Sequence, residues 1–296
     1  MHRHGRCRHA RARCAVKEAC KKTCEELAQS ALDKARGQRA SSGSSFIIDA
    51  QSLSYRFTLS HASNLASDAR QAIFKLLTAN MQPLYGASSA GWDPIGKEQE
   101  LFDDASRFIL VHRADSSFDD LAAFLMFRFD VEECSVNDEL ARFASIPPTQ
   151  SPDGGQARQA RQRPPDGCAD EGDKCFRDNS DDESNKGIDM DADEDLEIEV
   201  AYLYEVQVSA RHQRIGLGAK LVQALEDMAG EAGMAKVVLT VFLANKDAVS
   251  FYKRLKYKID QISPSIVLGP KEAKQQGFDY HIMSKSLRMS LFVAKS

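Results

Sequence analysis

The chain has 296 residues, of which 43% are hydrophobic and 28% are charged, and its formal net charge at pH 7 is -4. These values are typical of one sizeable globular domain with appendages, or of two small domains. No run of 18 or more apolar residues occurs, so we expect no transmembrane helix and no membrane partner. Seven cysteines without zinc-finger spacing favour free thiols in a reducing compartment and no metal.

The N-terminal residues are strongly basic. Residues 1–14 carry arginine and histidine, no acidic residue, and no apolar core of a secretory signal. Such a segment is compatible with a nuclear localisation signal, a nucleic-acid contact or a mitochondrial transit peptide. For the protein as a whole we expect localisation in the nucleus and cytoplasm, and we expect no direct nucleic-acid partner. Residues 16–36 have helical spacing and residues 37–45 have the composition of a linker. Residues 1–45 are therefore predicted to be a basic head, a helix and a linker.

The next segments predict one strand, one helix and one hairpin. Residues 46–60 alternate like a strand. Residues 63–85 place apolar side chains on one helical face, with Ser63 as the expected N-cap. Two apolar runs, 107–114 and 120–132, are separated by a short polar turn, which is typical of a hairpin.

A change of composition follows the hairpin. Residues 134–195 are mostly proline, glycine, glutamine and acidic residues, with little to bury. A loop of that length does not belong in a compact domain as ordered structure. We therefore predict a disordered acidic insertion in a domain that spans residues 46–290, with a tail at 291–296.

The remaining segments alternate between strand and helix patterns. The expected order is strand 196–208, a glycine-containing loop, a helix from Gly216, strand 235–243, helix 245–256, strand 257–262 and a last strand within 278–287. Strands that alternate with helices after a hairpin indicate a mixed α/β sheet.

The loop before Gly216 has the character of an anion site. Free backbone N–H groups at a helix N-terminus bind phosphate, and glycine lets a ligand approach the backbone. A Walker-type loop would need a serine or threonine for magnesium, but Ala219 and Lys220 follow Gly218. A dinucleotide fold would need three glycines near its first strand-helix unit. An ordinary glycine turn remains an alternative.

A resemblance narrows the choice of ligand. The segment "QRIGLG", residues 213–218, is similar to the Q/R-x-x-G-x-G/A signature of the GNAT acetyltransferase superfamily. The segments "LTANMQPLY", Trp92, "FRFDVE", "YLYEVQV", "LTVFLANKDAVSFY" and "DQISPS" together resemble the histone-specific N-terminal acetyltransferase D family over most of residues 60–290. Two departures are the acidic insertion and Gln213, where arginine is common.

The resemblance implies a fold and a reaction. It implies an α/β fold of the GNAT type, with a mixed, strongly twisted central sheet flanked by helices. It also implies acetyl transfer from acetyl-CoA to the N-terminal amine of histones four and two-A, by a monomer that needs no metal. A lysine or small-amine acetyltransferase on the same fold, or a non-catalytic histone-tail binder, are the alternatives.

The resemblance also implies two catalytic residues. Glu205 matches the general base, acting through a water, and Tyr252 takes the position of the donor that protonates the leaving thiolate. Strict alternation along the strand would place Glu205 on one face with Leu203 and Gln207. From the sequence pattern alone, the alternatives are an exposed strand carboxylate for Glu205, which the spacing favours, and a packing residue for Tyr252.

Two further sets of residues follow from the resemblance. The N–H group of Val206 or Val208 is expected to polarise the acetyl carbonyl. The coenzyme is expected to contact the loop and its neighbours: Val206, Val208, Gln213, Arg214, Ile215, Gly216, Leu217, Gly218 and Asn245. The histone tail is expected to meet aromatic walls and two carboxylates for its arginine: Tyr85, Trp92, Tyr202, Tyr204, Tyr280, Asp130 and Glu132. Ordinary packing is the alternative for each aromatic residue.

Overall fold

A computed structural model describes residues 3–34, 39–50, 52–115, 120–134 and 196–288. Its strands are β1 (Arg39–Ser42), β2 (Ser45–Ala50), β3 (Leu53–His61), β4 (Arg107–Arg113), β5 (Leu121–Cys134), β6 (Leu196–Val208), β7 (Lys236–Phe242), β8 (Lys258–Ile259) and β9 (Tyr280–Ser286). Its α-helices are α1 (Arg3–Lys21), α2 (Cys24–Lys34), α3 (Ser67–Gly86), α4 (Pro94–Leu101), α6 (Leu217–Glu231), α7 (Lys246–Arg254), α8 (Pro264–Val267) and α9 (Pro270–Gln275). The predicted insertion, apart from Cys134, and the predicted tail lie outside the described residues.

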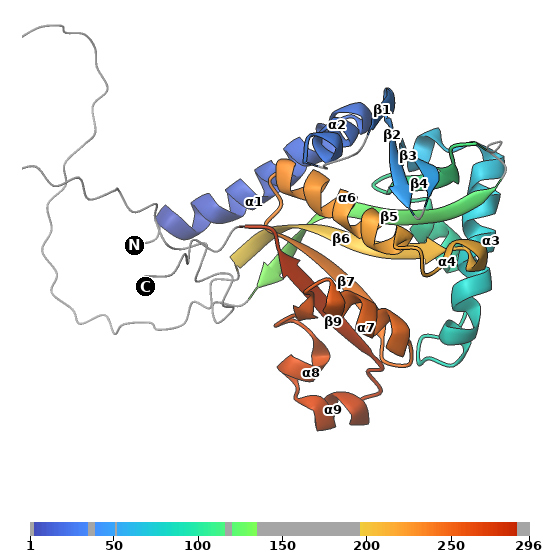
Figure 1. Ribbon diagram of the computed structural model, residues 1–296. Helices are drawn as coiled ribbons and strands as arrows, with labels where there is room; N and C mark the ends of the chain where they lie inside the picture. Colours follow the sequence, from blue (N-terminus) through green and yellow to red (C-terminus); the bar gives the residue numbers. More distant parts are fainter. Residues whose placement is uncertain (1–2, 35–38, 51, 116–119, 135–195, 289–296) are drawn as a thin grey trace, which may run out of the picture.

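All nine described strands form one mixed sheet, in the order β1-β2-β3-β4-β5-β6-β7-β9-β8. Neighbouring strands are antiparallel except β6 and β7, which run parallel. The longest pairing joins β5 to β6, with Ala123 opposite Val208 at one end and Cys134 opposite Leu196 at the other. The predicted α/β fold with a mixed, twisted sheet flanked by helices is confirmed (Figure 1).

Helices cover both faces of the sheet. On one face, α1, α2 and α6 run alongside one another (Figure 1), and residues such as Leu27 and Leu221 share one buried cluster with Leu125 of β5. On the other face, Ile73 of α3 packs with Phe124 in a second cluster. The helical residues of the predicted basic head therefore contribute to the same core as the sheet.

The predicted helix from Gly216 is confirmed as α6, and its expected apolar stripe is buried. That stripe consists of Leu217, Leu221, Val222, Leu225 and Met228. Because these positions recur at helical spacing, one face of α6 lies against the sheet and fixes where the helix begins. Among the described helices, none is both long and apolar enough to cross a membrane.

Four local predictions were wrong. The predicted linker 37–45 contains strand β1, which pairs with β2. The predicted strand 46–60 is two strands, β2 and β3, which pair as a hairpin with Ser52 in the left-handed region at φ 68°. The predicted helix 16–36 is broken between α1 and α2, where Thr23 and Glu26 form a reciprocal capping box. Ser63 does not cap α3: it lies in a short 3₁₀ turn, and α3 begins four residues later, at Ser67.

Candidate active site

The parallel strands β6 and β7 separate where the site is formed. Their pairing begins at Val200 with Lys236 and ends at Leu203 with Leu239, yet β6 continues to Val208 alongside β5. No other described strand pairs with this edge of β6 beyond Leu203. The end of β6 therefore presents backbone hydrogen-bonding groups that no strand satisfies.

The orientation of that backbone follows from three hydrogen bonds. Ser209 N donates to Ala122 O of β5 at 2.9 Å, and hydrogen-bonding positions alternate along an antiparallel pair. Val208 and Val206 therefore face away from β5. In agreement, Val208 O accepts hydrogen bonds from Asn80 Nδ2 at 3.2 Å and from Gln213 Nε2 at 3.1 Å. The N–H groups of the two valines point toward the gap between β6 and β7.

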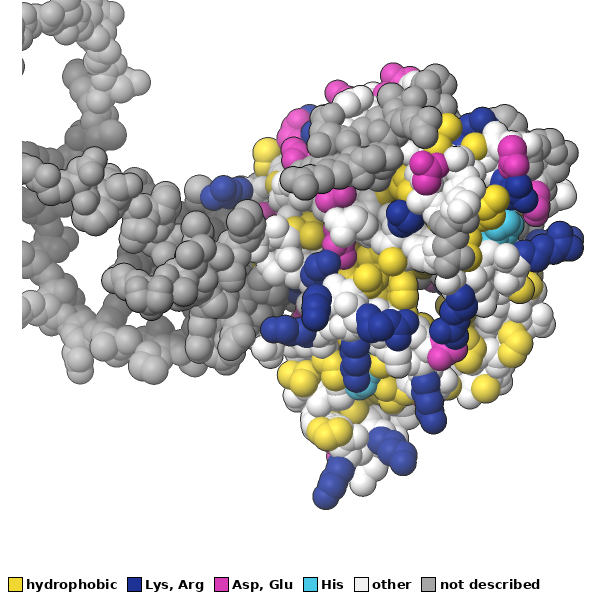
Figure 2. Space-filling view, in the orientation of Figure 1, with side chains coloured by type: hydrophobic (Ala, Val, Ile, Leu, Met, Phe, Trp, Pro, Cys, Tyr) yellow, Lys and Arg dark blue, Asp and Glu magenta, His cyan; other side chains and the backbone are white. Residues whose placement is uncertain are grey.

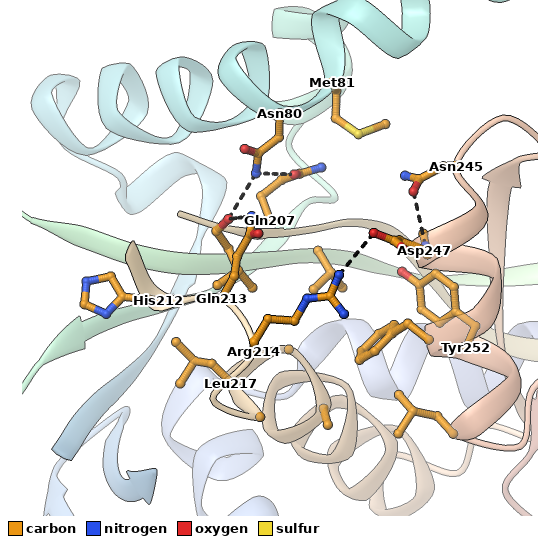
Figure 3. Close-up of a pocket in the computed structure, with 18 of the residues that line it drawn as sticks. Asn80, Met81, Gln207, His212, Gln213, Arg214, Leu217, Asn245, Asp247 and Tyr252 are labelled. Atoms are coloured by element: carbon orange, nitrogen blue, oxygen red, sulfur yellow. Dashed lines mark hydrogen bonds and ion pairs between the residues drawn. The ribbon is translucent and has the colours of Figure 1, made fainter. Parts of the chain in front are cut away.

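A cavity of about 740 Å³ occupies this gap. Its walls come from β6, the glycine loop, the start of α6, the end of α3 and one side of α7 (Figure 3). The predicted coenzyme residues that line it are Val206, Val208, Gln213, Arg214, Gly216, Leu217, Gly218 and Asn245. Ile215 is the exception, because its side chain packs against the core instead.

The loop geometry suits a phosphate-bearing ligand. Gly216 is the N-cap of α6 with φ 87°, and no side chain caps the first N–H groups of this helix. Arg214, also left-handed at φ 64°, and Arg254 both line the cavity. Uncapped amides and two guanidinium groups are the donors that a pyrophosphate prefers.

Basic residues extend over the surface beside the cavity. Figure 2 shows lysine and arginine side chains gathered over the part of the molecule that α7, α8 and α9 occupy. Exposed members of this group include Lys253, Lys271 and Lys274. Lysines and arginines outnumber the acidic residues Asp247 and Glu272 on α7 and α9, and a net positive surface attracts anionic ligands from a distance.

The left-handed glycine of the loop supports a first prediction. We expect Gly216→Ala to weaken coenzyme binding about tenfold, because a Cβ at positive φ costs roughly 1–2 kcal/mol and relaxing that strain moves the neighbouring amides. Calorimetric titration with coenzyme A would measure the change.

Gly233→Ala is the matched control for this prediction. Gly233 has φ 86° and, like Gly216, no atom within 4 Å of an added Cβ, but it lies just beyond the other end of α6. Its substitution should lower the melting temperature to a similar degree and leave coenzyme affinity unchanged. Equal losses of affinity in the two variants would contradict the prediction.

A β-bulge changes the face on which Glu205 lies. Met126 and Phe127 are consecutive on β5, and they pair with Glu205 and Leu203 on β6. Tyr204 lies between these two partners and is therefore the extra residue of the bulge. Leu203 belongs to the cluster beneath α6, whereas Tyr204 packs in the cluster beneath α3. The prediction that Glu205 shares a face with Leu203 was wrong. Its partner on that face is Gln207.

Glu205 is buried and held by two neighbours. It is 5% exposed. Lys97 Nζ of α4 lies 2.7 Å from its Oε1, and Gln207 Nε2 donates to its Oε2 at 2.8 Å. Gln207 in turn accepts from Asn80 Nδ2 at 2.9 Å (Figure 3). Because Asn80 and Gln207 line the cavity, Glu205 lies directly behind its wall.

Tyr252 lines the cavity from the opposite side, on α7. Burial, and to a smaller degree the charge of Glu205, raises the pKa of its hydroxyl above the ordinary value. The phenol therefore stays protonated near neutral pH and has a proton to donate. Within the described part of the chain, its hydroxyl has no hydrogen-bond partner.

The predicted aromatic residues gather in two groups joined by β7. The ring centre of Tyr85 lies 5.7 Å from that of Trp92 and 5.0 Å from that of Phe242. Phe242 of β7 is the strand partner of Tyr280 of β9. The ring centres of Tyr202 and Tyr204 lie 4.8 Å apart. The hydroxyl oxygen of Tyr202 is 2.5 Å from Oγ1 of Thr240, which is a residue of β7. Burial, followed by the charge of Glu205, raises the pKa of Tyr85. Tyr85 therefore lies near Glu205.

The two predicted carboxylates differ in their surroundings. Asp130 is exposed. Burial raises the pKa of the Tyr204 hydroxyl, and the nearby charge of Asp130 raises it further to a smaller degree. Glu132 instead lies 2.5 Å from Lys236 Nζ, an interaction that occupies its carboxylate. Asp130 is thus the more accessible acceptor for a substrate cation, and the roles of both residues stay predictions.

Sequence reasoning missed Lys97, Asn80 and Gln207 as members of the site. Helix α4 carries Lys97 and was not predicted, although Asp93 followed by Pro94 is a helix-start signal: Asp93 Oδ1 accepts from Gly96 N at 3.0 Å. Nothing in the sequence of α3 or β6 indicates that Asn80 and Gln207 meet. Among the described residues, no group of three or more His, Cys, Asp or Glu side chains is placed to hold a metal ion.

Comparison with known proteins agrees with this geometry. Residues 187–257 match the Acetyltransferase (GNAT) family. The matched segment contains β6, the glycine loop, α6, β7 and α7, which form most of the cavity. The fold is therefore the GNAT fold, and the match supports an acyltransferase of the GNAT family.

Several solved structures are similar in fold. The NatC complex bound to Gag peptide and CoA has 8% identity and a TM-score of 0.41, covering 78% of this chain and 99% of that chain. Arabidopsis thaliana NAA60 in complex with acetyl-CoA has 8% identity and a TM-score of 0.42, and the match covers 78% of this chain and 98% of that chain. The ribosomal-protein-S18-alanine N-acetyltransferase from Escherichia coli has 14% identity and a TM-score of 0.37, and the match covers 81% of this chain and 99% of that chain.

Proposed function

We propose that this chain transfers the acetyl group of acetyl-CoA to the N-terminal α-amine of a protein tail, with histone tails as its substrates in the nucleus and cytoplasm. The observation that carries the proposal is the unpaired end of β6. It places two outward-facing N–H groups in a cavity with an uncapped helix N-terminus, and a buried carboxylate directly behind its wall.

The residues fit the chemistry of acyl transfer. An α-amine has a reference pKa of roughly 8, so about a tenth of it is already neutral near pH 7. Glu205 accepts the proton of the attacking amine through a water, and the N–H groups of Val206 and Val208 stabilise the charge on the acetyl oxygen. The new C–N bond replaces the C–S bond, and Tyr252 protonates the departing thiolate.

The substrate assignment rests on the aromatic groups and on Asp130. Tyr85, which lies near Glu205, and its neighbour Trp92 offer flat walls for small first residues. Asp130 near Tyr204 offers an exposed acceptor for a guanidinium. A tail that begins Ser-Gly-Arg-Gly has both features. This fit favours a histone tail over an isolated small amine.

The test is incubation of the full chain with acetyl-CoA and a free-amine histone-tail peptide, beside an N-terminally blocked copy with the same lysines. We expect mass spectrometry to find one acetyl group on the α-amine of the free peptide and none on the blocked copy. Acetylation of the blocked copy would assign lysine chemistry instead. Peptide binding without turnover would leave only a histone-tail binder.

A further inference from the structure

The site contains a buried cation that the proposed chemistry does not use. Lys97 Nζ lies 2.7 Å from Glu205 Oε1 and 2.5 Å from Glu100 Oε1, and 5.3 Å from the centre of the Tyr85 ring. Its side chain is 9% exposed and Glu205 is 5% exposed. An ion pair so well removed from water is costly to form unless its geometry is good and its remaining hydrogen bonds are satisfied.

Both oxygens of Glu205 have a fixed partner. Lys97 holds Oε1, while the Gln207 amide holds Oε2 at 2.8 Å. Gln207 is itself fixed by Asn80 at 2.9 Å, and Lys97 by Glu100. The five side chains form a continuous polar chain through α3, β6 and α4, with Glu205 at its centre. Such a chain removes the rotational freedom of the central carboxylate.

The local structure explains why Lys97 reaches this position. Helix α4 starts at Pro94 behind the Asp93 cap, and Lys97 N donates to Asp93 O at 3.0 Å. Lys97 and Glu100 are three residues apart and lie on one side of the helix. The cap therefore sets the register of α4 that aims the ammonium group at Glu205.

Lys97 also keeps its proton. Burial by itself would lower the pKa of Lys97, but the carboxylate of Glu205, with smaller contributions from Tyr85 and Glu100, raises it above the ordinary value. The side chain thus remains a cation throughout the physiological range. A permanent cation cannot serve as the base or relay the proton of the amine, which leaves an electrostatic and orienting role.

We propose that Lys97 is a positioning residue for acetyl transfer, which holds the carboxylate of Glu205 in one orientation behind the cavity wall while Glu100 fixes Lys97 in turn. This inference rests on the proposed function, because it assigns Lys97 a role in the reaction proposed above. It does not place Lys97 in contact with either substrate. Consistent with that, Lys97 does not line the cavity.

The experiment compares Lys97→Gln, Glu205→Gln and the double variant with the unmodified chain. We expect Lys97→Gln to lower kcat about tenfold or more, because a small misplacement of a catalytic group has large effects on rate. The KM for acetyl-CoA should stay within about twofold, since Lys97 lies outside the cavity wall. In the Glu205→Gln background, Lys97→Gln should change kcat by less than about twofold, because it acts through Glu205.

Three controls separate this role from a general loss of structure. Lys75→Gln, at an exposed position of α3, should leave kcat unchanged. Lys97→Arg keeps the charge and should recover much of the activity. Glu100→Gln leaves the Lys97–Glu205 pair in place and should lower kcat by about threefold through loss of orientation, so it tests the same chain if Lys97→Gln does not fold.

The outcomes discriminate cleanly. An unmodified chain that acetylates no α-amine would overturn the proposed function and this inference with it. An active chain in which Lys97→Gln retains kcat would overturn the inference alone. The same holds if the effects of Lys97→Gln and Glu205→Gln multiply in the double variant, since Lys97 would then act independently of Glu205. If Lys97→Gln does not fold, an unchanged kcat in Glu100→Gln would have the same meaning.

Discussion

Glu205→Gln is expected to lower kcat about 100-fold at pH 7, the size of effect that loss of a general base produces. The amide keeps the shape of the side chain and removes its capacity to take a proton. Because Glu205 lies behind the cavity wall and not in it, coenzyme affinity should change little. Steady-state kinetics with a free-amine histone-tail peptide and calorimetry with coenzyme A would measure the two quantities.

The pH dependence of this variant provides a sharper test. An α-amine with a pKa of roughly 8 is about 10% neutral at pH 7 and about 90% neutral at pH 9. Above its pKa the amine is already neutral and no longer has to be deprotonated before it attacks, so the part of the Glu205→Gln deficit that comes from this step should shrink as pH rises. A deficit that is constant from pH 7 to pH 9 would show that Glu205 does not deprotonate the ammonium form of the substrate.

Glu226→Gln is the matched control for Glu205→Gln. Glu226 is also a buried glutamate paired with a lysine, Lys285, at 2.6 Å, but it lies on α6 away from the cavity. Its substitution alters stability without reaching the site, so kcat should be unchanged. A comparable loss of kcat in both variants would attribute the effect to weakened packing.

The resemblance and the hydrophobic pattern predicted most of the architecture around the cavity. The strand pattern in 196–208, the glycine loop and the stripe on α6 are local features of the sequence, and the strand, loop and helix form at the expected residues. The residues implied for the coenzyme then gather because one strand, one loop and one helix carry nearly all of them. Local patterns suffice where the site is built from consecutive elements.

The environment of Glu205 could not be predicted, because it depends on tertiary structure. The bulge at Tyr204 leaves the apolar-polar alternation of the sequence intact while it reverses the face of every later residue. Lys97, 108 positions before Glu205, reaches it only because α3 and α4 fold over that face. Pairings between distant elements leave no periodic signal in the chain.

A buried charge cluster at the opposite end of β7 is expected to stabilise the sheet strongly. Lys236 is fully buried, with Nζ 2.5 Å from Glu132 of β5 and 2.9 Å from Asp260, which follows β8. We expect Lys236→Met to reduce the free energy of unfolding by about 3–5 kcal/mol, because the buried carboxylates lose their shared cation. For a domain of this size that corresponds to a fall in melting temperature of roughly 10 °C.

The contribution of this cluster should depend on pH with a definite sign. Although burial opposes its ionisation, Lys236 lowers the pKa of Asp260 below the ordinary value near 4. The stabilisation by Asp260 is therefore present above that pH and is lost as pH falls through the lowered pKa. In Lys236→Met the same carboxyl gains stability by taking a proton, so the difference between the two proteins should narrow from pH 7 toward pH 4.

Two further variants test whether the charge, and not the side-chain volume, is responsible. Lys21→Met removes a lysine from an exposed pair with Glu18 and should leave the melting temperature almost unchanged. Combining Lys236→Met with Glu132→Gln and Asp260→Asn removes all three charges and should recover a large part of the lost stability, since breaking a buried ion pair costs more than replacing it. If the triple variant were less stable than Lys236→Met alone, packing around the lysine stem would be the cause, and the electrostatic account of this cluster would be wrong.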